Sequence, residues 1–187
     1  MTSAPPPTRR ARSSLTAREI LAAAEKVAAA GLDALTMRAV ALELKASPMA
    51  LYRYFATKDA LVDALLDGAL GRIAVPDTTD DWRHDLAAFA RAHRAVLEDN
   101  SWAVIPLFSH PNPGPNAFTI GGVAFAILAR GGSVGDPAVA DFSAILALNY
   151  GWCAFGTSRE KLPQEYGSEA HYERALGHLV DGIAASL

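Results

Sequence analysis

The sequence predicts an all-α protein: a small N-terminal three-helix unit that contains a helix-turn-helix, followed by a larger helical domain. Apolar residues recur at intervals of three and four along most of the chain, as they do on one face of a helix. No segment alternates apolar and polar residues with the period of a strand. Capping residues, prolines and glycines stand at the ends of the periodic segments. We therefore expect three regions, 1–14, 15–70 and 71–187.

Residues 1–14 (MTSAPPPTRRARSS) combine three consecutive prolines with three arginines, Arg9, Arg10 and Arg12. Proline-rich, charged segments are extended and do not pack into a core, so we expect a flexible basic arm. Two interpretations of the arm stay open. It is either an ordinary solvated terminus or a segment that contacts the minor groove of DNA.

Capping residues predict the first two helices. Thr16 is a helix N-cap with Glu19 as its capping-box partner, and Gly31 ends the helix that follows. Thr36 is the next N-cap, for a short helix that runs to about Leu44.

The segment 45–47 (Lys-Ala-Ser) is predicted to be a tight turn. Ser47 then caps a third helix whose first residue is Pro48, a position where the missing N–H costs nothing. Leu51 and Phe55, one turn apart, face inward. The second and third helices thus form a helix-turn-helix.

A fourth helix, from about Lys58 to Leu70, links the two parts of the chain, and the polar segment Val75–Asp80 separates it from the larger domain. Three prolines in Ser109–Pro115 predict a loop. The helices expected in the larger domain are Asp81 to about Leu97, a short one at Trp102–Phe108, about Asn116 to Gly131, Asp136 to about Gly156, and Ser168 to Ala185.

Charge is divided unevenly along the chain, whose formal net charge is -3. Residues 1–58 hold nine Lys and Arg against four Asp and Glu, a net charge of +5, which leaves the remainder at -8. A basic N-terminal part on an acidic body is expected if only the first part meets phosphate groups.

Several classes of protein are disfavoured. The single cysteine, Cys153, excludes a disulfide within the chain and favours a reducing, cytoplasmic compartment. No secretory signal and no run of eighteen apolar residues is present, so we expect no membrane partner. An enzyme with Cys153 as nucleophile and a histidine as base is the alternative from another class. Because Cys153 stands in an apolar run without a triad, phosphate loop or metal motif, we expect no enzyme, cofactor or metal.

In a helix-turn-helix, the second helix enters the major groove and the flanking groups hold phosphates. The small and apolar residues that begin this helix suit contact with thymine methyl groups, and the basic and hydroxyl groups beside them can donate hydrogen bonds. The alternatives are that the two tyrosines only cover the core and that Thr36 is only a cap. The residues expected to contact DNA are Thr36, Lys45, Ser47, Pro48, Met49, Ala50, Tyr52, Arg53, Tyr54 and Lys58.

The segment LTMRAVALELKASPMALYRYFATKDALVDALLD resembles the DNA-binding domain of TetR-family transcriptional regulators, and the resemblance covers about residues 15–70. Its core is formed by Leu51, Tyr52, Tyr54, Phe55 and Lys58, with tyrosine at position 54 where the family more often has histidine. Beyond residue 81, DDWRHDLAAFARAHRAVL and GPNAF resemble the C-terminal domain of the branch that includes the tetracycline repressor.

The resemblance implies an all-helical homodimer that binds a palindromic operator in double-stranded DNA and is released by a small-molecule effector. By the same resemblance, Thr36, Tyr52, Tyr54 and Lys58 contact phosphates, while Lys45 and residues 47–50 lie at or near the bases. An alternative keeps the DNA binding but has no effector.

The larger domain holds enough apolar material for both a core and a ligand pocket. His93 and Asn149 are informative because each places a hydrogen-bonding group on a mainly apolar helix and needs a partner, which is either protein or ligand. Few charges between Trp102 and Phe155 favour an apolar or aromatic effector, and although His110 adjoins the proline-rich loop we predict no metal. The candidate ligand-binding residues are Phe89, His93, Trp102, Phe108, Phe118, Phe125, Asn149 and Trp152.

The last two predicted helices carry broad apolar faces, which either form a four-helix dimer interface or close the chain's own core. Two reading heads roughly 34 to 36 Å apart would match successive major grooves, which favours a homodimer. The residues of these faces are Ala140, Ile145, Leu148, Leu176, Leu179, Val180 and Ile183.

Overall fold

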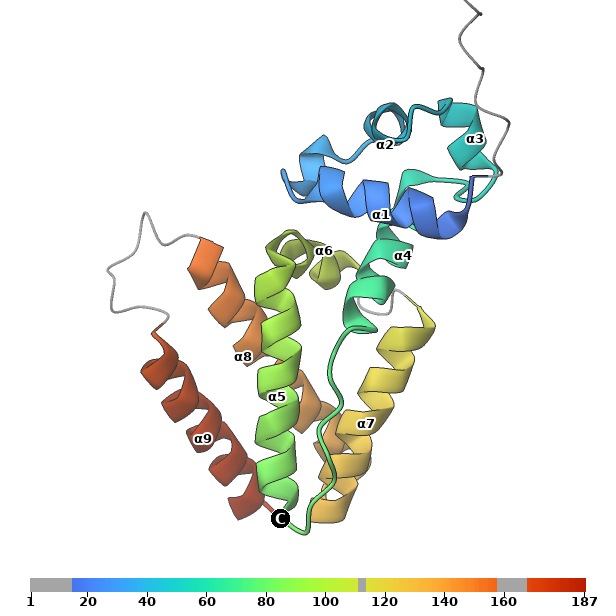
Figure 1. Cartoon of the computed structure of the whole chain (residues 1–187). Helices are drawn as coiled ribbons and strands as arrows, with labels where there is room; N and C mark the ends of the chain where they lie inside the picture. The colour runs from blue at the N-terminus through green and yellow to red at the C-terminus, as the bar shows by residue number, and fades with distance from the viewer. Residues whose placement is uncertain (1–14, 111–113, 158–167) are drawn as a thin grey trace, which may run out of the picture.

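The computed structural model describes residues 15–110, 114–157 and 168–187, so the predicted arm 1–14 lies outside the described residues. The all-α prediction is confirmed, because the described ranges contain helices and 3-10 turns and no strand. The helices α1–α3 and the start of α4 form a small unit, called the head below (Figure 1). The helices α5–α9 form a larger bundle, called the body.

The helices of the head begin at capping residues and pack together through their apolar faces. Its α1 (Ala17–Ala28) begins with the predicted capping box, in which Thr16 Oγ1 accepts from the Glu19 amide at 3.2 Å and Glu19 Oε2 accepts from the Thr16 amide at 2.9 Å. The chain continues through a 3-10 turn at Leu32–Ala34 into α2 (Met37–Glu43) and α3 (Pro48–Tyr52). The buried core shared by these helices consists of Ile20, Ala24, Leu35, Val40 and Leu51.

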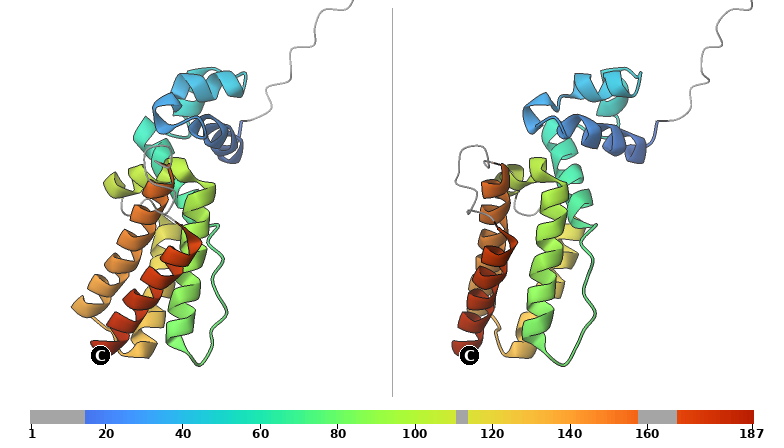
Figure 2. Two further views of the ribbon diagram at one scale, coloured as in Figure 1. Left: turned by 90° about the vertical axis from the view of Figure 1, so that its left-hand side faces the viewer. Right: turned by 60° about the vertical axis from the view of Figure 1, so that its left-hand side comes forward.

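The body is a bundle of long helices that alternate in direction. Its central helix α5 (Trp82–Asp99) packs against α7 (Pro115–Gly131), α8 (Asp136–Thr157) and α9 (Glu169–Ala185). The short α6 (Val104–Ser109) lies at the end of the body nearest the head (Figures 1 and 2). In both views of Figure 2, α2 and α3 lie on the side of the head that faces away from the body.

The helix α4 (Lys58–Leu70) connects head and body, and it packs against α1 on one side and α7 on the other. An extended segment, the strap (residues 73–80), then runs along the body to the start of α5 (Figure 1). Asp85 fastens the strap: it is buried, it accepts from the Thr79 amide at 3.0 Å and hydroxyl at 2.7 Å, and it pairs with Arg130. The Arg130 guanidinium holds the pKa of the Asp85 carboxyl well below its usual range.

The short helix predicted at about Trp102 to Phe108 is present, but it consists of two pieces. The chain forms a 3-10 turn at Ser101–Ala103 and then α6, which starts at Val104. Pro106 is the third residue of α6, where its missing N–H would have no partner within the helix in any case.

The apolar helix α8 differs from expectation in two ways. Asp136–Phe155 is long and apolar enough to cross a membrane by length and composition, although no such segment was expected. The same helix is a packed part of the bundle, in contact with α5, α7 and α9, and it buries the polar side chain of Asn149. Only 22% of the segment is buried within the chain, so packing against these helices accounts for part of its apolar character.

The structure decides between the two interpretations of the broad apolar faces of α8 and α9 for most of their residues. Ile145, Leu176, Val180 and Ile183 are at most 6% exposed within the single chain, so they close its own core. Leu148 and Leu179 are half-buried, and Ala140 alone of the set is exposed. The four buried residues are therefore not available to an interface between copies.

Candidate DNA-binding surface and effector site

The first helix of the predicted helix-turn-helix, α2, starts at a threonine cap. Thr36 Oγ1 accepts a hydrogen bond from the Ala39 amide at 3.0 Å, which satisfies one of the free N–H groups in the first turn of α2. The Thr36 side chain is exposed, and its hydroxyl hydrogen is not used in the cap. The two interpretations of Thr36 as cap and as phosphate contact are therefore compatible.

The turn between α2 and α3 depends on a lysine in a left-handed conformation. Lys45 has a φ of 52°, in a region where glycine is the usual residue. The Lys45 amide donates to Leu42 O at 3.0 Å, and the Ala46 amide donates to Ala41 O at 2.9 Å. These two bonds form a Schellman motif that ends α2 and directs the chain into α3. Lys45 is exposed at this turn.

The recognition helix α3 is short and is anchored by one buried residue. Pro48 occupies its first turn, and Leu51, which is fully buried, fixes α3 against α2 and the head core. Ser47 takes the N-cap position as predicted, but its side chain makes no capping hydrogen bond. Its exposed hydroxyl is therefore not used by the helix, and Met49, 72% exposed, projects beside it from the first turn.

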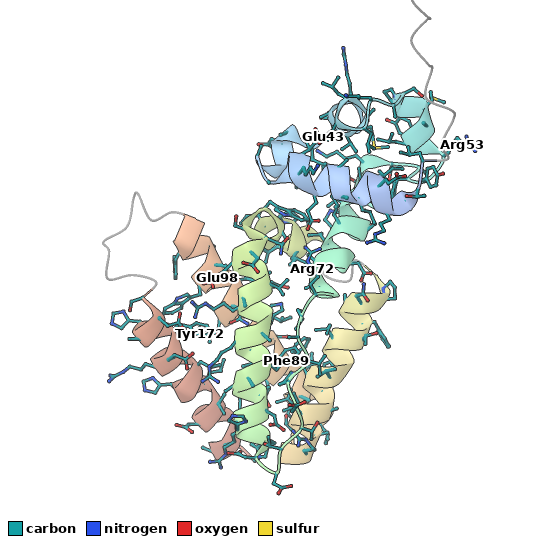
Figure 3. The ribbon with its side chains drawn as sticks, in the orientation of Figure 1. Glu43, Arg53, Arg72, Phe89, Glu98 and Tyr172 are labelled. Atoms are coloured by element: carbon teal, nitrogen blue, oxygen red, sulfur yellow. The ribbon has the colours of Figure 1, made fainter. Side chains whose placement is uncertain are left out.

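The predicted DNA contacts lie together on this part of the head. All ten are exposed except Ala50, which is half-buried. Figure 3 shows Arg53 at the outer, right-hand edge of the head. Tyr52 and Tyr54 are 44% and 42% exposed. The Tyr54 hydroxyl donates to Leu15 O at the start of α1, so Tyr54 already has a protein partner and only its oxygen is left to accept.

The basic side chains of this surface are available to phosphates. Among the described residues, no carboxylate lies within ion-pairing distance of Lys45, Arg53 or Lys58. Two carboxylates of the head are paired elsewhere, Glu43 with Lys26 at 3.5 Å and Glu25 with Arg72 at 2.6 Å. The surface formed by α2, the turn and α3 therefore carries uncompensated positive charge, which suits a polyanion.

In the body, aromatic rings from four helices form a continuous row, called the aromatic row below. Its members are in contact in sequence, with ring centroids 5.2 to 6.4 Å apart. The His93 ring stacks on the Phe89 ring with an angle of 6° between their planes. The row runs in the order Phe125 of α7, Phe142 of α8, Phe89 and His93 of α5, Tyr150 of α8, and Phe108 of α6.

The structure brings together five of the eight predicted ligand-binding residues. Phe89, His93, Phe108 and Phe125 belong to the aromatic row, and Asn149 joins it through a hydrogen bond to His93. The other three lie apart. Phe118 is 80% exposed on α7, Trp102 is half-buried against the core, and Trp152 packs edge-on against Tyr172 at 5.6 Å.

The predicted ligand-binding residues do not include two members of the aromatic row, Phe142 and Tyr150. Both lie on α8, where Phe142 precedes Asn149 by seven residues, about two turns, and Tyr150 follows Phe142 by eight. That helical spacing is visible in the sequence and would have identified them.

A cavity of about 360 Å³ lies between the strap and the helices α5 and α7. Its walls are mainly apolar, and the buried Asp85 and the exposed Arg130 in its lining are already paired with each other and with Thr79. None of the eight predicted ligand-binding residues lines it. Within the described ranges, no three His, Cys, Asp or Glu side chains gather to hold a metal ion.

Polar contacts connect the body to α4. Asp67, buried on α4, accepts from the Ala117 amide at 3.0 Å and from Asn116 Nδ2 at 3.0 Å, so it caps the first turn of α7 from outside that helix. Gly114 allows this approach, because a Cβ there would lie 2.7 Å from the Asp67 carboxyl carbon. Asp63 of α4 also pairs with His110 at the end of α6. The helix α4 thus contacts both the head and the body helices that carry the aromatic row.

Comparison with known proteins matches residues 20–65 to the family described as bacterial regulatory proteins, tetR family. The transcriptional repressor DrrR1 of Streptomyces coeruleorubidus is 32% identical over 189 residues, covering 96% of this chain and 68% of that protein. A helix-turn-helix regulator of Saccharopolyspora erythraea is 35% identical over 114 residues, covering 60% of this chain and 48% of that protein. The chain thus spans about half the length of the second relative.

Solved structures resemble the whole described fold. BioQ of Mycobacterium smegmatis superposes with a TM-score of 0.77 at 28% identity, covering 91% of this chain and 99% of that one. BioQ bound to its double-stranded DNA operator gives a TM-score of 0.72 at 27% identity, with the same coverage. A TetR variant of Acinetobacter baumannii in complex with minocycline gives 0.78 at 26% identity, covering 90% of this chain and 96% of that one.

Proposed function

This chain belongs to the TetR family of bacterial regulatory proteins, and from that premise we propose that it is a repressor that binds a palindromic DNA operator as a homodimer. A small, mainly apolar or aromatic effector bound in the body releases it from DNA. The protein acts in the cytoplasm, and residues 15–70 and 71–187 are its DNA-binding and effector-binding domains.

The observation that carries the proposal is the group of unpaired cations around the recognition helix. Lys45, Arg53 and Lys58 are exposed without a carboxylate partner among the described residues, next to the exposed first turn of α3. Phosphate contacts of this kind fix a helix-turn-helix on DNA, while the residues at the start of the second helix read base edges. The operator complex of BioQ, which has the same fold, supports this use of the surface.

Mobility shift with the DNA upstream of the protein's own gene, measured over a salt series, tests the proposal. Arg53→Ala is expected to weaken binding and to reduce the salt dependence. Arg83→Ala, which removes the same charge at the far end of the body, is the matched control and is expected to bind as the unaltered protein does. If the unaltered protein shows no sequence preference at low salt, or if both variants weaken equally, the assignment of this surface is wrong.

The outer faces of α8 and α9 are the proposed dimer interface. These helices lie side by side on one side of the body (Figure 2, left). Their exposed faces carry small residues at helical spacing, which permit close approach of a second pair of helices: Ala140, Ser143 and Ala147 on α8, and Ala170 and Gly177 on α9. In a two-fold interface, each residue meets its partner from the same patch on the other copy.

The charges on α9 fit such a two-fold arrangement. Arg174 and Asp181 are exposed on the Gly177 face, two turns apart. If two copies of α9 cross antiparallel near Gly177, Arg174 of one copy faces Asp181 of the other, twice. Arg174→Asp or Asp181→Arg alone is expected to weaken the dimer, and the double exchange to restore it. Analytical ultracentrifugation checks this, and a double variant no more dimeric than the single ones would contradict the pairing.

An effector-independent regulator remains the second candidate, and its test is operator affinity with and without candidate effectors. The contacts of Asp67 and Asp63 favour effector control, because they tie α4 to the body elements that carry the aromatic row. A disulfide that fixes α4 to α7 is expected to abolish release while leaving operator binding intact.

The family of this chain and the burial of its one thiol both argue against the enzyme alternative. Cys153 is buried, and burial raises the pKa of its thiol to about 11, so the reactive thiolate is scarce at neutral pH. Its Sγ lies 4.0 Å from Arg94 O and has no histidine base beside it among the described contacts. Cys153 is therefore an inert core residue.

A further inference from the structure

One guanidinium group joins the head to the body. Arg72 follows α4, and its Nη2 donates to Glu25 Oε1 of α1 at 2.6 Å and to Asn100 Oδ1 at the end of α5 at 2.8 Å. Its two partners are 47 and 28 residues away in the chain. Figure 3 shows Arg72 where the two units meet. The side chains of Glu25, Arg72 and Asn100 are called the bridge below.

The body end of the bridge is fixed. Asn100 is 7% exposed and ends α5 as its C-cap. Its Nδ2 donates to Val96 O at 2.8 Å, so its Oδ1 is the atom left to accept from Arg72. The Asn100 carbonyl also accepts from the Ala103 amide at 2.8 Å, which holds the residue to the turn before α6. Arg72 is therefore anchored on a packed part of the body.

The bridge attaches the head at a second place. The helix α4 packs against α1 in the head and against α7 in the body. A single connecting helix leaves the head free to turn about the axis of that helix. The bridge ties α1 to the end of α5 instead, and an attachment that lies off the axis of α4 resists such a turn. Head and body are thereby held at one angle.

This angle matters for reading DNA. Two heads of a dimer must meet successive major grooves, and one added base pair moves the second half-site by roughly 3.4 Å and turns it by roughly 35°. A head that is held at one angle accepts one spacing of half-sites. A head that can turn also accepts the neighbouring spacings.

We propose that Arg72 is a positioning residue that sets the spacing of operator half-sites that the protein accepts. It acts through Glu25 and α1 and does not itself touch DNA. The inference rests on the proposed operator binding by a homodimer, and it adds a determinant of operator specificity outside the recognition helix. Because the side chains of Arg72 and Glu25 are 47% and 41% exposed, the bridge contributes at most about fivefold for each head.

Distance measurements on the free protein test the bridge without DNA. Spin labels are placed at exposed positions of the head and of α5, in Asp33→Cys and Ala95→Cys, while Cys153 is buried. The labelled chain is diluted with unlabelled protein so that only distances within one chain are measured by pulsed electron resonance. We expect Arg72→Ala and Glu25→Ala to broaden the distance distribution. A distribution of unchanged width in both variants would overturn the proposal.

Operators of altered spacing test the consequence. The operator is located by footprinting the DNA upstream of the protein's own gene, and versions with one base pair added or removed between the half-sites are compared by mobility shift. In Arg72→Ala, the preference for the original spacing is expected to fall by about three- to fivefold for each head, and Glu25→Ala should give the same fall. The double variant should lose no more than either single one, because both remove the same bridge. Arg72→Lys keeps the charge and should keep part of the preference.

Arg91→Ala is the matched control. Arg91 is also 47% exposed and pairs with Glu173 at 2.7 Å, but this pair joins α5 to α9 within the body. It should keep both the width of the distance distribution and the spacing preference. An equal change in Arg91→Ala and Arg72→Ala, or an unchanged spacing preference in Arg72→Ala, would overturn the proposal. An unaltered protein without any specific operator would instead refute the proposed function, and the distance measurement would still decide whether the bridge holds the head.

Discussion

Replacing Lys45 by glycine is expected to stabilise the protein and to weaken its binding to DNA. Lys45 has a φ of 52°, where the Cβ of an ordinary residue crowds the backbone. That crowding costs roughly 1 to 2 kcal/mol, and the greater freedom of glycine in the unfolded chain offsets roughly 0.5 to 1 kcal/mol of the relief. The Schellman hydrogen bonds of Lys45 and Ala46 are backbone bonds and survive the change. The net expectation is a free energy of unfolding higher by about 0.5 to 1 kcal/mol.

The same change, Lys45→Gly, is expected to weaken DNA binding although it stabilises the fold. Each phosphate contact contributes about 0.9 to the slope of log affinity against log salt, so losing one contact per head lowers a dimer's slope by about 1.8. Urea unfolding measures the first effect, and a mobility-shift salt series measures the second. Lys45 stands at a position where its backbone conformation costs free energy, which indicates that its side chain serves a function on this surface.

Lys45→Ala separates the two effects, because it removes the charge and keeps the Cβ. It is expected to lose the same salt slope as Lys45→Gly without the gain in stability. If the two variants unfold at the same urea concentration, the strain assigned to the left-handed turn is refuted. If both keep the salt slope of the unaltered protein, Lys45 does not contact a phosphate.

Three further predictions concern the body. Burial lowers the pKa of His93 from 6.5 to about 4, so the unfolded chain binds the proton more readily than the folded chain does. Stability is therefore lost as the pH falls below 6.5, and urea titrations should show about 2 kcal/mol less stability at pH 5 from this group. His93→Phe should remove that contribution. Asp67→Ala leaves the first turn of α7 without its acceptor and should cost about 1 to 3 kcal/mol, whereas Asp67→Asn keeps one acceptor and should cost less; equal losses would contradict the cap. In Gly131→Ala the new Cβ would lie 2.6 Å from the Trp82 ring, so a loss of about 1 to 3 kcal/mol is expected on thermal unfolding, while Gly122→Ala, with nothing within 4 Å, should gain up to about 1 kcal/mol.

Local features of the head could be predicted from the sequence because each depends on neighbours within a few residues. The caps at Thr16 and Thr36 each bond to an amide three residues later, at 3.2 and 3.0 Å. The exposure of the DNA-facing side chains follows from the same local pattern, since a five-residue helix with one inward leucine leaves its other residues outside. The cap by the Ser47 side chain failed because Pro48, which opens α3, fixes the helix start without it.

The sequence by itself determined the helices, their order, and the surface of α2 and α3 with its unpaired cations, because helical periodicity and capping act over one or two turns. Only the tertiary structure decided which faces of α8 and α9 are core, and which rings join the aromatic row. It also decided the partner of Asn149, whose hydrogen bond reaches a carbonyl 59 residues away in the chain. Contacts of this range depend on how whole helices pack, and an apolar stripe is the same in sequence whether it meets the chain's own core, a second copy or a ligand.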